Sequence, residues 1–143
     1  MGAWGTGYFE NDDAMDWLND LSSNPGWQIV SAAFEEVEST KGDYLEAPEG
    51  SAAVAAAAVL AGKFLTVTPA GPTSLGLPEA AIKVVDSLPA PSGGLATLAK
   101  SALAAVDAEN SELFELWQEA DPSDFKAWRA SLRRLREILP ARR

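Results

Sequence analysis

The sequence predicts an all-α fold: a single domain of six or seven helices, with a glycine- and aromatic-rich arm at its amino end. Apolar residues recur at spacings of three and four along most of the chain, and segments rich in proline and glycine separate these runs. The strand-like run at 64–68 has no second strand to pair with. With 143 residues, of which 47% are hydrophobic and 22% charged, the chain can bury one continuous core, so we expect one domain over 1–143.

Residues 1–11 predict an arm that folds back on the core. Three glycines free its backbone, and Trp4, Tyr8 and Phe9 supply large apolar surfaces that must be covered. Asn11, Asp12 and Asp13 then offer oxygens that can cap the first helix.

Seven segments carry helical patterns with start and stop signals. We expect helices at about 12–22, 26–40, 49–66, 78–88, 94–107, 111–120 and 122–139. The third is rich in alanine on every side, which allows close helix approach and predicts a central, surrounded position. Residues 69–78 hold three prolines and two glycines and predict a loop, after which Pro78 is expected at the first helical position.

The last helix, 122–139, is amphipathic. Its apolar residues form one seam at spacings of three and four: Phe125, Trp128, Leu132, Leu135 and Leu139. A basic stripe runs beside the seam: Lys126, Arg129, Arg133 and Arg136. The preceding helix carries an acidic stripe, Glu112, Glu115 and Glu119, and we expect the two stripes to face each other. The alternative, a basic helix for nucleic acid or a membrane surface, is less favoured because acids lie next to it.

Composition restricts the chemistry. The chain has no cysteine and no histidine, which removes thiolate chemistry, the commonest general base and the commonest zinc ligand. Net charge is −10, with −16 over residues 1–125 and +6 over 126–143. We therefore expect no nucleic-acid partner, and no membrane association because the apolar run at 52–61 is much shorter than the ~20 residues of a span. No secretory signal pattern opens the chain, and we expect a cytoplasmic protein.

Four carboxylates gather near the first helix: Glu10, Asp12, Asp13 and Asp16. Oxygen ligands of this kind suit calcium or magnesium, and Asp12 and Asp16 lie one turn apart. The favoured interpretation is structural: Asp12 or Asp13 caps the helix, and acids in the first turn favour its dipole. We therefore expect no cofactor and no metal, with these four residues as the alternative site.

No nucleophile, base or phosphate-binding motif stands out, so an enzyme is less favoured than a binding protein, although a lysine- or carboxylate-based activity stays open. The aromatic residues Trp4, Tyr8, Phe9 and Trp17 are either core or, where exposed, anchors for a partner. We expect an acidic protein that acts by binding another protein, such as an inhibitor or immunity-type partner of a basic protein. The alternative function is divalent-metal or small-ligand binding by the carboxylates near Glu10.

The opening pattern Gly-Ala-Trp-Gly-x-Gly-x-Phe-x-Asn-Asp-x-Ala-x-Asp-Trp resembles the start of a bacterial family classed only as a domain of unknown function. The alanine-rich segment 51–61 and the Ser-Glu-Leu-Phe-Glu-Leu-Trp segment 111–117 are similar to segments of that family. The resemblance implies no activity, ligand or catalytic residue.

Overall fold

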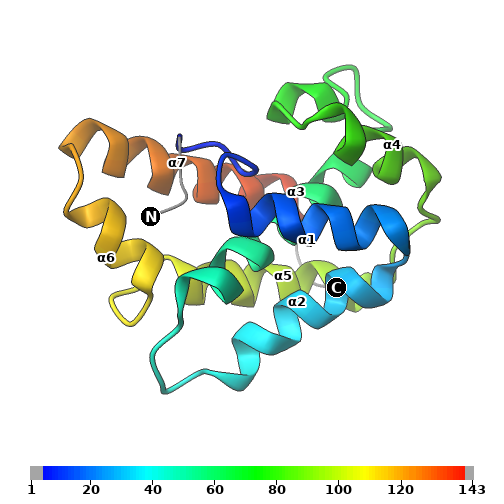
Figure 1. Cartoon of the computed structure of the whole chain (residues 1–143). Helices are drawn as coiled ribbons and strands as arrows, with labels where there is room; N and C mark the ends of the chain where they lie inside the picture. Colours follow the sequence, from blue (N-terminus) through cyan, green and yellow to red (C-terminus); the bar gives the residue numbers. More distant parts are fainter. Residues whose placement is uncertain (1–4, 141–143) are drawn as a thin grey trace.

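The computed structural model of the chain describes residues 5–140 and shows an all-α bundle, as predicted (Figure 1). Its helices are α1 Asp12–Ser23, α2 Trp27–Ser39, α3 Ala47–Leu65, the 3-10 helix η1 Pro72–Leu75, α4 Glu79–Ser87, α5 Gly93–Val106, α6 Glu112–Gln118 and α7 Pro122–Ile138. The described part of the chain contains no strand, only one isolated bridge between Leu45 and Ser111. None of its helices is long and apolar enough to cross a bilayer.

Helix α3 is the centre of the bundle. It packs against each of the other helices and against η1, and every residue from Ala53 to Gly62 is buried. Alanine and glycine make this possible, because their small side chains let several helices approach one axis closely. At Gly62, an added Cβ would lie 3.0 Å from a methyl group of Leu77. The central position predicted from the alanine content is therefore confirmed.

The helix boundaries agree with the prediction to within about two residues at most ends, and two start signals differ. Asn11, not Asp12 or Asp13, caps α1: its side-chain oxygen accepts a hydrogen bond from the Ala14 amide at 2.8 Å. Pro78 precedes α4 as its cap residue instead of occupying the first helical position. Both differences are shifts of one or two residues at the start of a helix, which is the least certain part of a helix prediction.

The amino-terminal arm packs on α7 through its aromatic residues. Tyr8 and Phe9 are buried, and the Tyr8 hydroxyl donates a hydrogen bond to the Ser131 carbonyl at 2.8 Å. Burial raises the pKa of Tyr8 to about 12, against a smaller opposing effect from the positive charge of Arg134. Trp4 lies outside the described residues.

The predicted pairing of the α6 and α7 stripes is wrong. On α7, Arg129 pairs instead with Asp107 at the end of α5, at 2.8 Å, and Arg136 approaches the same carboxylate at 3.8 Å. The guanidinium of Arg129 also lies 5.4 Å from the centre of the Phe114 ring. The apolar seam itself is confirmed, since Trp128 and the three leucines after it are buried and Phe125 is half-buried.

Two acidic side chains of α6 accept hydrogen bonds from the start of α3 and from the loop before it. Glu112 accepts a hydrogen bond from the Ala47 amide at 2.8 Å, and Glu115 accepts one from the Tyr44 hydroxyl at 2.6 Å. Beside them, the Leu45 amide donates to the Asn110 carbonyl and the Glu112 amide donates to the Leu45 carbonyl, both at 2.8 Å. These bonds join two loops that are about half the chain apart in sequence.

Candidate functional site

The four carboxylates of the predicted metal cluster do not converge. Glu10 folds back so that its carboxylate accepts a hydrogen bond from the Gly7 amide at 2.8 Å. Asp12 and Asp16 are exposed on α1, and Asp13 is half-buried. Within residues 5–140, no group of three or more acidic side chains is placed to hold a metal ion.

The four predicted interaction aromatics fall into different surroundings. Tyr8 and Phe9 belong to the core, so their rings are not open to a partner. Trp17 is half-buried on α1, where one part of the indole packs on the core and the other faces the surface. Trp4 lies outside the part of the chain that the structure describes. Among the described three, Trp17 alone is placed to contact another molecule.

Trp17 lies at the edge of a shallow groove, which we call the α1–α2 groove. Helices α1 and α2 both pack on α3, and the groove lies between them with a volume of about 370 Å³. Helix α2 contributes Ile29, Ala32 and Glu36 to its wall. Its lining joins Trp17 of α1 to one face of α2 and to the first turns of α3.

The local sequence explains why this groove is apolar and shallow. Ile29, Ala32 and Glu36 follow each other at spacings of three and four, so they share one face of α2. Pro48 and Ala52 close the groove from the start of α3. Alanine side chains are too short to fill the space between the helices, so a hollow stays open beside the indole of Trp17.

The charged residues around the groove are all acidic. Glu36 and Glu49 are part of its lining, and no lysine or arginine of the described chain lines it. Asp20 is exposed three residues beyond Trp17, which places it one helical turn away on the same side of α1. An apolar floor and an indole are therefore surrounded by negative charge.

A family model covers the whole of this region. The model of a family described as a domain of unknown function, DUF4259, matches residues 2–131. The chain belongs to this family. The matched residues include the arm, the α1–α2 groove and the first half of α7. The family description assigns no role to the arm or to the groove. No curated protein and no solved structure matches the chain.

Sequence reasoning found Trp17 but missed the remainder of the groove. Ile29 follows the apolar spacing of α2 but is only half-buried. Glu36 lies seven residues, or two helical turns, after Ile29, so both side chains share one face of α2. This spacing is the signal that could have predicted an acid beside the apolar residues of the groove. Pro48 and Glu49 come from another helix, and no spacing in the sequence indicates that they meet Trp17.

Proposed function

We propose that this protein acts by binding a basic protein, and that the α1–α2 groove is its docking surface. The observation that carries the proposal is the half-buried Trp17 beside an apolar groove whose charged neighbours, Glu36, Glu49 and Asp20, are all acidic. The proposal concerns the kind of partner, a protein with lysine or arginine next to an exposed apolar side chain.

The apolar part of the groove supplies the contact area. Tryptophan is enriched among the residues that dominate binding energy at protein interfaces, because a large ring can be desolvated at low cost in side-chain entropy. An apolar side chain of the partner would lie between Trp17 and Ile29, over Ala52. The small residues leave room for that side chain without a change in the backbone of α1 or α2.

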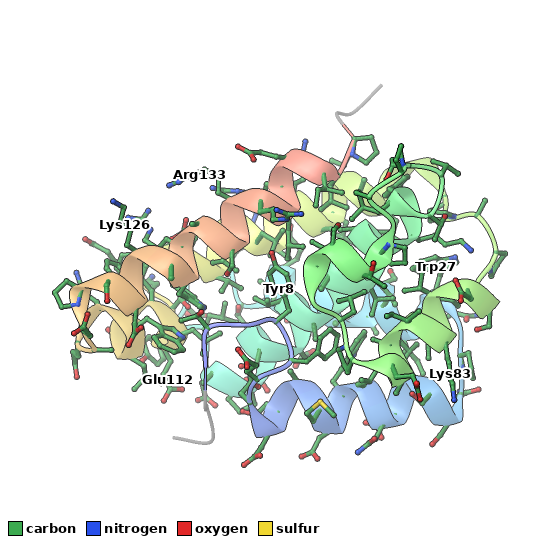
Figure 2. All side chains as sticks on the ribbon, turned by 90° about the horizontal axis from the view of Figure 1, so that it is seen from above. Tyr8, Trp27, Lys83, Glu112, Lys126 and Arg133 are labelled. Carbon is green, nitrogen blue, oxygen red and sulfur yellow. The ribbon has the colours of Figure 1, made fainter. Side chains whose placement is uncertain are left out.

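The acidic rim supplies direction and selectivity. Carboxylates around an apolar centre attract a basic surface during encounter and repel an acidic one, and the effect weakens as salt is added. Lys126 and Arg133 do not cancel this field locally, because Figure 2 shows both on α7, across the molecule from α1. The fold therefore keeps its basic helix away from the acidic groove.

Site-specific crosslinking tests the proposal. A photoreactive amino acid replaces exposed Ala32 at the groove, and a second protein carries it at exposed Ala80 on α4 as the matched control. We expect a basic protein to be captured from the native host at position 32 but not at position 80. The captured protein is then purified and its affinity measured at low and high salt.

Charge reversal completes the test with the purified partner. The double variant Glu36→Lys and Glu49→Lys should weaken binding by about tenfold at physiological salt, since each reversed rim charge costs about 0.7 kcal/mol. The control Glu79→Lys and Asp86→Lys changes the net charge equally on α4 and should leave the affinity unchanged. Equal effects of the two double variants, or binding that does not depend on salt, would contradict the proposal.

A further inference from the structure

A second hollow, which shares no lining residue with the α1–α2 groove, lies under the amino-terminal arm. It has a volume of about 200 Å³ and is enclosed by the arm, the starts of α1 and α3, and helices α6 and α7. Figure 2 shows Glu112 of α6 beside the arm that carries Tyr8. The volume is smaller than the roughly 300–1,000 Å³ of pockets for drug-sized ligands, so any ligand has to be compact.

One wall of this arm cavity is apolar and aromatic. Trp117 of α6 and Trp128 of α7 line it, with their rings stacked at a centroid distance of 6.5 Å and an interplanar angle of 20°. Leu116 and Val54 complete the apolar surface. Trp128 also stacks with Phe125, so the indoles offer the cavity an apolar surface that covers alkyl or aryl groups.

Helix α3 also brings to the cavity a polar group that has no partner among the described residues. Ser51 is only 3% exposed, lines the cavity, and its hydroxyl forms no hydrogen bond to another residue within 5–140. No fully buried side-chain oxygen or nitrogen of the described chain lacks a partner. The Ser51 hydroxyl must therefore face open space, and the space beside it is the cavity.

Two carboxylates also reach the cavity, and no lysine or arginine of the described residues lines it. Asp13 forms no ion pair or hydrogen bond with another described residue. Glu112 uses one carboxylate oxygen to accept the bond from Ala47 at the start of α3. The start of α1 likewise already has its acceptor in Asn11, so neither helix start needs an anion from a ligand.

We propose that the arm cavity binds a small organic cation, a primary ammonium on a compact apolar body. The ammonium donates hydrogen bonds to Asp13 and Ser51, and the apolar body lies against Trp117 and Trp128. A carboxylate and a buried hydroxyl that have no partner among residues 5–140, together with an aromatic wall, match this chemistry better than they match an anion or a neutral hydrocarbon. The inference is independent of the protein partner proposed for the α1–α2 groove.

Three probes of equal size and different charge test the proposal on the full chain: benzylamine, benzyl alcohol and benzoate. Binding is measured by calorimetry and by NMR, with the indole N–H signals of Trp117 and Trp128 as reporters. We expect saturable binding of benzylamine with shifts of both indole signals, weaker binding of benzyl alcohol, and no binding of benzoate.

Matched variants locate the charge. Asp13→Asn should weaken benzylamine binding by about threefold to fivefold, as expected for a partly exposed ion pair, and leave benzyl alcohol unaffected. Asp16→Asn removes the same charge from the same helix outside the cavity and should leave both affinities unchanged. The proposal is wrong if benzylamine does not bind, if benzoate or benzyl alcohol binds as tightly, or if both variants have the same effect.

Discussion

Replacing Tyr8 by phenylalanine removes one oxygen atom and leaves the packing of the arm in place. The side chain is 7% exposed, and its hydroxyl donates to the Ser131 carbonyl at 2.8 Å across 123 positions of sequence. A typical intramolecular hydrogen bond contributes about 0.5–1.5 kcal/mol net, because the unfolded chain makes the equivalent bond to water. The phenylalanine ring keeps the same apolar contacts, so we expect Tyr8→Phe to lower the free energy of unfolding by that amount.

Urea denaturation followed by circular dichroism measures this loss, with Tyr44→Phe as the matched control. The Tyr44 hydroxyl also donates a hydrogen bond, to Glu115, but this side chain is 46% exposed and water replaces the lost partner. Its replacement should change stability by less than about 0.5 kcal/mol. If Tyr8→Phe costs no more than Tyr44→Phe, then the buried bond to Ser131 does not hold the arm on α7.

The same variant tests the titration of Tyr8. Burial raises its pKa from 10.0 to about 12 in the folded state, so the unfolded chain loses this proton at lower pH than the folded one. The stability that Tyr8 contributes is therefore complete below pH 10 and falls as the pH rises from about 10 to about 12. Wild type should lose stability relative to Tyr8→Phe over that interval, and parallel curves would contradict the assignment.

Two further substitutions probe the interior. The Asp107 side chain is 5% exposed, and Asp107→Ala leaves the guanidinium groups of Arg129 and Arg136 without this carboxylate. The substitution should lower the free energy of unfolding by about 1–3 kcal/mol in urea denaturation. The control Asp86→Ala, at an exposed position of α4, should not lower it by that amount. A Cβ added at Gly62 would already lie 3.0 Å from a methyl group of Leu77, so Gly62→Val adds methyl groups where there is no room. This variant should lose about 1–3 kcal/mol of unfolding free energy, measured as a lower melting temperature. The control Ala80→Val, at an exposed position, should lose well under ~1 kcal/mol. Equal losses within either pair would show that burial is not the cause.

The helices could be predicted from the sequence because their signals are local. Proline and glycine mark the breaks, and spacings of three and four mark the apolar faces. The position of α3 followed from its alanine content, since a helix that is apolar on every side can be stable only when it is surrounded. These features depend on residues a few positions apart, which one sequence shows directly.

The partners of the charged residues could not be predicted in the same way. Glu112 and Arg129 each had an obvious candidate on the neighbouring helix, and both bond elsewhere: Glu112 to the start of α3, and Arg129 to Asp107. Ala47 and Asp107 both come from segments outside the α6–α7 pair, and their approach to these side chains depends on how the whole chain packs. The same reason explains why the lining of the α1–α2 groove, which combines three helices, was only partly foreseen through Trp17.

The position of α3 also determines how the molecule can come apart. Every other helix covers some part of α3, so the middle of α3 stays covered unless several of its neighbours detach together. Amide hydrogens in the middle of α3 should then exchange with deuterium only when the entire chain unfolds, at the full free energy of unfolding. The loop after α3, which includes the exposed Val67, follows directly on this slowly exchanging part of the helix. The protection of backbone amides against exchange should therefore rise from minimal to maximal within about two helical turns.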